Sequence, residues 1–360
     1  MDQVSTSVEV LVIGAGQAGL SAGYHLRKAG LTPGQGFLMV DHAPGPGGAW
    51  QFRWPSLTLT TVNRVSDLPG MTFDETLTPG SDQVRASEAV PRYYAEYERR
   101  FELDVRRPTT VRVVCDRGDT GFHVETDSGD IATRGLINAT GTWDRPFVPH
   151  YRGAEIFSGA TLHTKDYRDA REFVGKHVVV VGGGISAIQL LDEISQVTST
   201  TWVTRSEPRF RDGPFDPEAG RRAVAMVEER VRAGLPPGSV VSVTGLPVTD
   251  AVRAARDRGA LQRKPMFDTI EPDGVRWADG TFARADVILW CTGFRSALDH
   301  LAPLRLRGPG GGITMTGRLA TQVAADPRIH LLGYGPSAST IGANRAGRAA
   351  VRELLAALAD

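Results

Sequence analysis

Short apolar runs recur along the chain, each followed by a turn and an amphipathic segment, and predict alternating strands and helices. Two of the runs, at 8–13 and 178–181, lead into glycine-rich turns, GAGQAG at 14–19 and GGGISA at 182–187. A helix is expected after each turn, to about Lys28 and to about Ser195. This order of strand, glycine-rich turn and helix is typical of dinucleotide-binding folds. The chain is therefore expected to be an α/β protein with two Rossmann-like domains.

The remaining apolar patterns predict further elements around these two units. Strands are expected at 37–40, 109–115, 121–126, 135–138, 200–204, 285–290 and 329–332, and helices at 87–101, 218–233, 249–258 and 339–358. The polar stretch at about 210–265 is interpreted as a helical insertion over the cofactor cleft. The last strand and helix carry no third glycine-rich turn, so they are expected to return to the first domain.

Composition narrows the range of partners. Lys and Arg together number 41, as do Asp and Glu, so the formal net charge is zero, which argues against nucleic acid or an anionic membrane surface as the main partner. Cys115 and Cys291 form no CxxC pair, so neither a disulfide framework nor a thiol redox pair is expected, and a cytoplasmic location is predicted. No apolar stretch approaches the roughly 20 residues of a membrane span. No metal site is expected.

The acid after the first domain's second strand indicates which cofactor that domain takes. Asp41 follows the strand at 37–40 and stands where dinucleotide folds place a carboxylate for the ribose hydroxyls. The N-terminal domain is therefore expected to bind a dinucleotide with a free ribose, and FAD is favoured.

The corresponding place in the second domain carries Thr204, Arg205 and Ser206 instead of an acid. A guanidinium there suits a 2′-phosphate, and a charge-assisted hydrogen bond is worth roughly 1.5–3 kcal/mol. The second domain is therefore predicted to prefer NADPH over NADH. The alternative is that Arg205 is one of the chain's many solvated arginines.

A third motif lies beside the two glycine-rich turns. Phe157-x-Gly159-x3-His163-x3-Tyr167, followed by Arg168, resembles the signature of the class B flavin-dependent monooxygenases. The GGAW element at 47–50, ATG at 139–141 and CTGF at 291–294 agree with this resemblance, which covers nearly the whole chain. The length of the chain, and the Tyr167-Arg168 pair at the end of the signature, resemble those of the short bacterial flavin-containing monooxygenases.

The resemblance implies a glutathione-reductase-like architecture, with an FAD domain at 1–156 and 295–360 and an inserted NADPH domain at 157–294. It also implies a cycle in which NADPH reduces FAD, a C4a-(hydro)peroxyflavin forms with O2, and one oxygen passes to a soft nucleophile. Small-molecule sulfides and amines are the expected substrates, and some ketones are included. The alternatives are a flavoprotein reductase or oxidase without oxygen insertion, and a non-catalytic nucleotide sensor. Oligomeric state is open, with a homodimer as one option.

Site residues follow from the motifs and from the resemblance together. His163 and Tyr167 would orient the domains, and Thr60 stands where larger members carry an asparagine over the flavin. The expected contacts of the first cofactor are Gly14, Gly16, Gln17, Ala18, Gly19, Asp41, His42, Gly48, Trp50, Val111, Thr140, Gly141, Thr340 and Ile341. Those of the second are Gly182, Gly184, Ser186, Ala187, Arg205, Ser206, Thr292 and Gly293.

Overall fold

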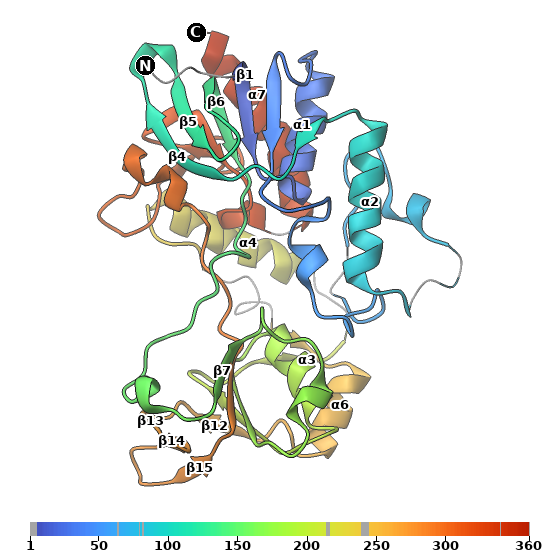
Figure 1. Cartoon of the computed structure of the whole chain (residues 1–360), viewed down its shortest axis with the longest axis vertical. Helices are drawn as coiled ribbons and strands as arrows, with labels where there is room; N and C mark the ends of the chain where they lie inside the picture. The colour runs from blue at the N-terminus through green and yellow to red at the C-terminus, as the bar shows by residue number, and fades with distance from the viewer. Residues whose placement is uncertain are drawn as a thin grey trace. The chain divides into compact units, whose positions relative to one another are not determined.

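The structure, a computed structural model, describes residues 6–62, 65–78, 80, 83–213, 217–238, 245–338 and 340–359, with the backbone alone at 217, 219, 340 and 341. The chain forms two compact units, one from residues 1–142, 224–238 and 296–360 and one from 143–223 and 239–295 (Figure 1). Each unit contains a parallel sheet flanked by helices, which confirms the predicted fold class.

The first unit is built on a nine-stranded sheet. Its parallel part runs in the order β19-β6-β1-β2-β3, and β17, β18, β4 and β5 extend it through antiparallel pairs. The strands are β1 (Thr6–Ile13), β2 (Phe37–Val40), β3 (Val105–Arg106), β4 (Val111–Asp116), β5 (Phe122–Thr126), β6 (Ile131–Asn138), β17 (Met315–Thr316), β18 (Gln322–Val323) and β19 (Asp326–Leu331).

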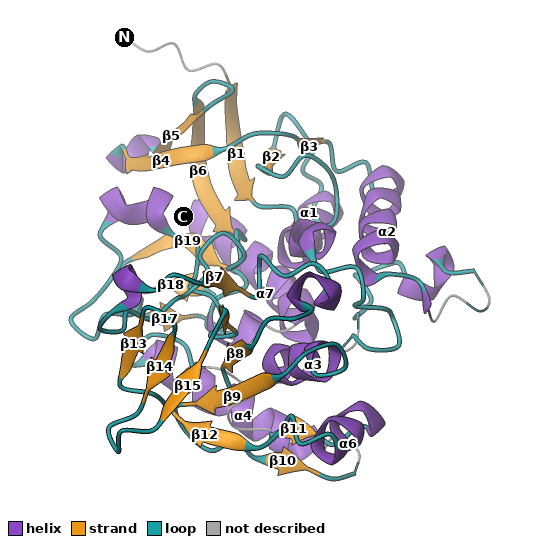
Figure 2. Ribbon diagram, turned by 60° about the horizontal axis from the view of Figure 1, so that its bottom comes forward, coloured by secondary structure: helices purple, strands orange, loops and turns teal. Residues whose placement is uncertain are grey.

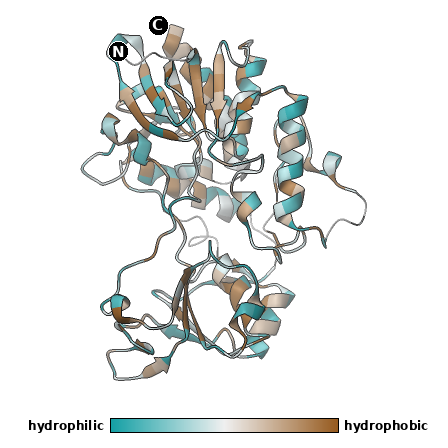
Figure 3. Cartoon of the chain, viewed as in Figure 1, coloured by the Kyte–Doolittle hydropathy of each residue, from teal (hydrophilic) through white to brown (hydrophobic). Residues whose placement is uncertain are grey.

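Both faces of this sheet are covered, and alternate residues of β1 enter two different cores. Val10 and Val12 pack in the core with the helices, whereas Leu11 and Ile13 pack in the core on the opposite face. All four side chains are at most 4% exposed. The central strands are accordingly rich in apolar residues, and the brown parts of the ribbons in Figure 3 mark them.

Three long helices of this unit cover the first of these two cores. They are α1 (Gln17–Lys28), α2 (Ala86–Arg100) and α7 (Thr340–Ala359). Helix α2 presents three buried tyrosines, whose hydroxyls donate to the Gln17 side chain and to the carbonyls of Pro69 and Met71. The turn-rich segment before α2 is thereby held to the helix, together with the 3-10 helices η1 (Gly48–Phe52) and η2 (Phe73–Thr76).

The second unit is built on a five-stranded parallel sheet in the order β12-β9-β8-β16-β7. Figure 2 also shows the three antiparallel strands β13, β14 and β15 side by side. Its strands are β7 (Ala160–His163), β8 (Val178–Val181), β9 (Thr200–Thr204), β10 (Phe210–Arg211), β11 (Leu246–Pro247), β12 (Arg263–Pro265), β13 (Thr269–Glu271), β14 (Gly274–Arg276), β15 (Phe282–Arg284) and β16 (Val287–Trp290), and its helices include α3 (Ile185–Ile194) and α6 (Asp250–Asp257).

The two units differ from the expected domain boundaries in two places. Residues 143–156 pack with the second unit, and residues 224–238, which hold the second half of α4 (Pro217–Arg232), pack with the first. The reason lies in the core, because Val231 is fully buried beside Ile313 and Tyr334, and Gly312 N–H donates to Gly234 O at 3.0 Å. The stretch at 210–265 is therefore not a single insertion into one domain.

Candidate cofactor sites

The first glycine-rich turn is enclosed by two neighbouring strands. Gly14 adopts φ +97° and its N–H donates to Val40 O at 2.8 Å, while a Cβ at Gly14 would lie 2.5 Å from Ala139 O. A Cβ at Gly19 would lie 1.9 Å from Gly14 O. The turn therefore has room only for glycine at both positions, and the predicted close approach of the ATG element is confirmed.

The predicted GGAW element lies on this turn as well. Gly48 adopts φ +52°, and a Cβ there would be 3.0 Å from the Cα of Gly16. Trp50 follows within η1, where it is half-buried and packs on the helical core, with the guanidinium of Arg53 5.8 Å from its ring centroid. The sequence elements expected around the first cofactor thus converge on one turn.

Asp41 is fixed by the backbone of the same region. Its side chain is 6% exposed; one carboxylate oxygen accepts from Ala15 N at 2.6 Å and the other accepts from Ala43 N at 2.8 Å. Each carboxylate oxygen can accept a second hydrogen bond, so both remain able to bind ribose hydroxyls. The neighbouring His42 is exposed, with Nδ1 3.8 Å from the Asp41 carboxylate.

Gln17 has a structural task that the sequence did not reveal. Its side chain accepts from the Tyr94 hydroxyl at 3.0 Å and donates to Ser66 O at 3.0 Å, so it points into a protein network. Only the backbone of Gln17 and Ala18, in the first turn of α1, faces the position of a bound anion. Burial raises the pKa of Tyr94 far above its usual value, which keeps this hydroxyl protonated.

The side chain of Thr140 is likewise hydrogen-bonded within the protein. Its hydroxyl donates to Ala297 O at 2.6 Å and accepts from Asn138 Nδ2 at 3.0 Å, and Asn138 Oδ1 is bonded to His300 Nε2 at 2.7 Å. Burial lowers the pKa of His300 to about 4, so its imidazole is neutral and donates from Nε2. This network fixes the carboxyl end of β6 to the returning segment, and nothing in the sequence pattern indicated His300.

Of the other expected contacts of the first cofactor, Gly141 joins this network, since its carbonyl oxygen accepts from Ala297 N at 2.9 Å. Gly141 adopts φ +64°, and Val111 begins β4, where it pairs with Thr126 of β5. Thr60 is exposed in a turn. The predicted start of the last helix at residue 339 lies outside the described residues, as do the side chains of Thr340 and Ile341, whose backbone opens α7.

The second glycine-rich turn repeats the geometry of the first. Gly182 adopts φ +146°, its N–H donates to Val203 O at 2.9 Å, and a Cβ there would lie 2.3 Å from Cys291 O. The predicted correspondence between the segments at 139–141 and 291–293 is therefore confirmed. Gly184 is the N-cap of α3, Ser186 lies in its first turn, and Ala187 is buried.

Both helices begin without a side-chain cap. The N-cap of α1 is Gly16 and that of α3 is Gly184, and neither provides a capping hydrogen bond. Their first-turn N–H groups therefore have no capping side chain and are positioned for an anion, as a pyrophosphate would require. The two turns fit dinucleotides on this ground.

A positive charge that the sequence reading missed lies at the end of β9. Arg205 and Ser206 are exposed there, as expected of residues that meet a 2′-phosphate. Strand β12 runs alongside β9, and Arg263 on it donates from Nε to the Thr204 hydroxyl at 2.6 Å. The three-residue β12 was too short to be predicted, so this second guanidinium was not expected.

His163 and Tyr167 belong to the signature segment, residues 157–168, which passes the carboxyl ends of the strands of the second sheet. His163 ends β7 and is 3% exposed; its Nδ1 accepts from Lys165 N at 3.1 Å and its Nε2 donates to Gly293 O at 2.9 Å. Burial is the main cause that lowers the pKa of His163, in keeping with a neutral ring. Since both ring nitrogens are used, His163 holds the β16 loop, and Thr292 holds it from the other side by donating to Phe147 O.

Tyr167 connects the same segment to helix α3. Its side chain is 1% exposed, its hydroxyl donates to Glu193 Oε2 at 2.7 Å, and its ring stacks on Phe173 at 5.9 Å. Burial and the Glu193 carboxylate both raise the pKa of Tyr167. The residue is therefore placed to fix α3.

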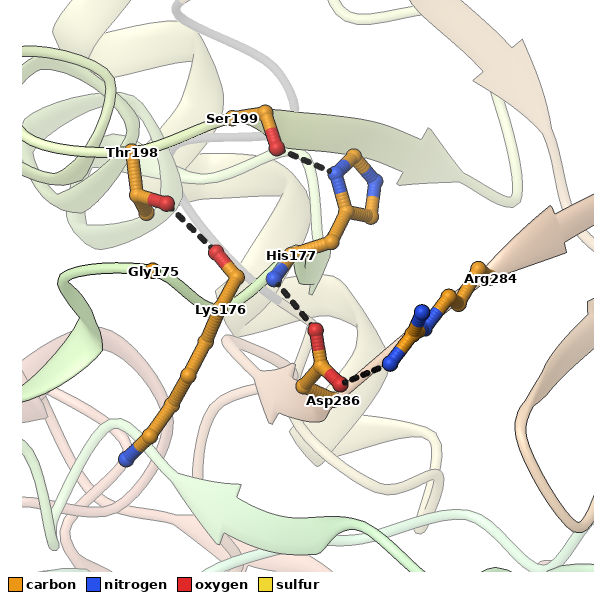
Figure 4. Close-up of a pocket in the computed structure, with 7 residues that line it drawn as sticks. All are labelled: Gly175, Lys176, His177, Thr198, Ser199, Arg284 and Asp286. Atoms are coloured by element: carbon orange, nitrogen blue, oxygen red, sulfur yellow. Dashed lines mark hydrogen bonds and ion pairs between the residues drawn. The ribbon is translucent and has the colours of Figure 1, made fainter.

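A cavity of about 340 Å³ lies at the opposite edge of this sheet, where β8, β9 and β16 begin (Figure 4). Ligands of parallel sheets bind at the carboxyl ends of the strands, so its position does not suit a dinucleotide. His177 bonds to Ser199 and Thr201 at 2.7 and 2.8 Å, and Asp286 accepts from His177 N at 2.7 Å. Polar groups that line the cavity are thus hydrogen-bonded to one another. Among the described residues, no group of His, Cys, Asp or Glu could hold a metal ion.

Comparison with known proteins places this geometry in a family. Residues 11–246 match the family model of the pyridine nucleotide-disulphide oxidoreductases. The structure of a flavin-containing monooxygenase from Stenotrophomonas maltophilia is similar, with 37% identity, a TM-score of 0.80, and coverage of 98% of this chain and 99% of that one.

Two curated relatives are more distant. An uncharacterized CzcO-like oxidoreductase of Geobacillus kaustophilus is 26% identical over 84% of this chain and 87% of its own length. The senecionine N-oxygenase of Tyria jacobaeae is 23% identical over 88% of this chain and 63% of its own. The chain therefore belongs to the pyridine nucleotide-disulphide oxidoreductase family and, within it, to the flavin-containing monooxygenases, enzymes that use FAD and NADPH.

Proposed function

We propose that the first unit binds FAD, that the second binds NADPH, and that the enzyme transfers one oxygen atom from O2 to the sulfur or nitrogen of a small molecule. The observation that carries the proposal is the repeated construction of the two turns. Each has a glycine clamped between two strands and a helix that begins without a side-chain cap.

The charges near the two turns support this assignment of cofactors. Asp41 presents a fixed carboxylate beside the first turn, which suits ribose hydroxyls and repels a 2′-phosphate. Arg205 and Arg263 provide two guanidinium groups at the end of β9, which suit that phosphate. FAD, whose adenosine ribose carries no 2′-phosphate, therefore fits the first unit and NADPH the second.

FAD held by the first unit and reduced by NADPH held by the second would supply the chemistry that activates O2, so that one oxygen atom would pass to the substrate and the other would leave as water. The chain's own contribution is to bind, orient and exclude water. His163 and Tyr167 orient the loop after β16 and helix α3, respectively, because their side chains are hydrogen-bonded to these two segments. Thr60 stays a predicted neighbour of the flavin.

A thiol-based reductase is disfavoured by the two cysteines. Cys115 belongs to the first unit and Cys291 to the second, and burial raises the pKa of Cys291 to about 12. A buried thiol that stays protonated is a poor nucleophile for disulfide exchange. The remaining rival is a flavin oxidase that reduces O2 without inserting oxygen.

Rapid kinetics with three probe substrates tests the proposal. The FAD-loaded protein is reduced anaerobically with NADPH and mixed with oxygenated buffer, alone and with thioanisole, N,N-dimethylaniline or cyclohexanone. A transient flavin spectrum that decays faster with the sulfide or the amine, together with the sulfoxide or N-oxide, is the expected result. Direct return to oxidised flavin with stoichiometric peroxide and no oxygenated product would establish an oxidase instead.

Two further properties stay predictions. No described helix has the length and apolarity that crossing a membrane requires. We infer a cytoplasmic location from the reduced cysteines expected in the sequence, and a fractionation experiment would test it. A homodimer is to be tested by sedimentation of the FAD-loaded protein.

A further inference from the structure

The two glycine-rich turns differ in what contacts the carbonyl oxygen of their first glycine. In the first turn, Gly19 of α1 comes so close that a Cβ there would lie 1.9 Å from Gly14 O. In the second turn the corresponding residue is Ala187, which carries a Cβ. An equally close approach of α3 to Gly182 O is therefore sterically excluded.

The Gly182 carbonyl has a different partner. Trp202 on β9 is 2% exposed, and its indole N–H donates to Gly182 O at 2.8 Å. The strand registers identify the equivalent residue in the first unit, because Val180 pairs with Trp202 as Val12 pairs with Met39. Methionine has no donor. The indole hydrogen bond thus occurs in the turn that lacks the third glycine.

Trp202 completes a clamp on Gly182. The N–H of this glycine already donates to Val203 O at 2.9 Å, so both polar groups of its backbone are tied to β9, one by the main chain and one by a side chain. The next residues, Gly183 and Gly184, lead directly into α3, whose first N–H groups have no side-chain cap. The orientation of these donors depends on how firmly the turn is held.

We propose that Trp202 is a positioning residue for the nicotinamide dinucleotide: its indole N–H fixes the second glycine-rich turn in the orientation that binds the pyrophosphate. The inference rests on the proposed binding of NADPH by the second unit. Trp202 itself need not touch the cofactor. Removing its N–H takes the indole donor away from Gly182 O and loosens the turn before the ligand arrives.

Trp202→Phe tests the inference, because phenylalanine remains aromatic and lacks the donor. Calorimetric titration of NADP⁺ into the oxidised, FAD-loaded protein should give a Kd about 3- to 10-fold higher than that of the wild type, the range expected for one lost neutral hydrogen bond. The KM for NADPH should rise by a similar factor, whereas FAD content and kcat at saturating NADPH should stay within about twofold of the wild-type values.

Trp277→Phe is the matched control. Trp277 is 7% exposed in the same unit, and its indole N–H donates to Pro265 O of β12, also at 2.8 Å, and not to the glycine-rich turn. The control should lower stability without changing the Kd for NADP⁺. Benzothienylalanine placed at position 202 keeps the shape of the ring and lacks only the N–H, so it should reproduce the effect of Trp202→Phe.

Three results would overturn the inference. These are wild-type NADP⁺ affinity in Trp202→Phe, an equal loss in Trp277→Phe, or wild-type affinity with benzothienylalanine at position 202. Arg205→Ala, measured alongside, separates this failure from that of the proposed function. If Arg205→Ala weakens NADP⁺ binding and Trp202→Phe does not, only the role of Trp202 is wrong. If neither changes the Kd, the assignment of NADPH to the second unit is wrong as well.

Discussion

Single residues at the ends of two equivalent strands distinguish the two dinucleotide turns. In each turn the N–H of the first glycine donates to the carbonyl oxygen of a valine, Val40 in the first unit and Val203 in the second. The buried Asp41 follows Val40, whereas Arg205 lies two residues after Val203. Both side chains could be identified from the sequence, because the position is fixed by the strand before it. Arg263 could not, since its proximity depends on strand pairing.

Arg205→Ala should raise the KM for NADPH about tenfold and leave the KM for NADH nearly unchanged, because a single charge-assisted hydrogen bond is worth roughly 1.5–3 kcal/mol. Steady-state NADPH and NADH oxidation measures both constants. Arg284→Ala is a suitable control, as this exposed arginine of β15 lines the cavity where β8, β9 and β16 begin, at the other end of these strands from Arg205, and pairs with Asp286. Equal rises with both nucleotides would contradict the role of Arg205.

His330 makes stability depend on pH. It is fully buried in β19, where Nδ1 is bonded to the Thr321 hydroxyl at 3.2 Å, and burial lowers its pKa from 6.5 to about 4. The unfolded chain then binds the proton more readily than the folded one. The stability that depends on the neutral ring is complete above pH 6.5 and is lost as the pH falls towards 4.

His330→Gln should therefore reduce the loss of unfolding free energy between pH 7 and pH 5 by about 1–2 kcal/mol. Urea unfolding at the two pH values measures this difference. The half-buried His25 and His300, whose pKa values are also lowered to about 4, leave the variant with some pH dependence. An unchanged loss in the variant would show that His330 is already protonated or does not differ between the two states.

Elements that were predicted well share one property: each carries a clear local pattern, which is a short run rich in apolar and β-branched residues for a strand or an apolar face for a helix. The strands at 37–40 and 200–204 match the predicted bounds, and α2 differs by one residue at each end. The strands β7, β12 to β15, β17 and β18 were not predicted. They have two to four residues each, which is too short for a pattern of alternation, and β7 and β12 in addition pair with strands from distant parts of the chain.

The signature segment illustrates the same limit for the site. Its residues were recognised as a motif, but the sequence did not reveal that Ala160–His163 is the edge strand β7 or that Tyr167 binds α3. The structure explains why the spacing matters: His163 and Tyr167 must reach β16 and α3 from one short segment. The motif is accordingly a structural support for the second turn.

A double-mutant cycle tests this support. Tyr167→Phe leaves the Glu193 carboxylate without the hydroxyl donor and should lower the free energy of unfolding by about 1–3 kcal/mol. Glu193→Gln should also destabilise, and the double variant should lose less than the sum of both, with a coupling energy of about 0.5–3 kcal/mol. Chemical unfolding of the four proteins measures the coupling. Additive losses would mean that the pair does not interact.

At the scale of the whole molecule, the chain is one dinucleotide-binding plan built twice. The doubling was evident in the sequence from the two glycine-rich turns. The boundaries were not, because residues 143–156 and 224–238 carry no motif and join their units through packing alone. Which unit takes which cofactor is the part that most needs a direct test.

Hydrogen exchange of the protein with each cofactor in turn supplies that test. FAD should protect the amides at 14–19, 47–50 and 139–141, whereas NADP⁺ should protect those at 182–187, 204–206 and 291–293, since a ligand slows exchange where its binding suppresses local opening. The strand β18, which belongs to neither set, provides the internal reference. Protection of residues 14–19 by NADP⁺ would reverse the assignment.

The first unit is assembled from three separate stretches of chain, and this has a consequence for its biogenesis. Helix α7 shares one core with α1, and Asn344 accepts hydrogen bonds from both Ser21 and Gln17. During synthesis, the glycine-rich turn of residues 14–19 leaves the ribosome long before α7 does. We therefore expect the nascent chain to acquire its flavin only after α7 has emerged from the ribosome, while the turn of residues 182–187, whose unit is complete by residue 295, can form earlier.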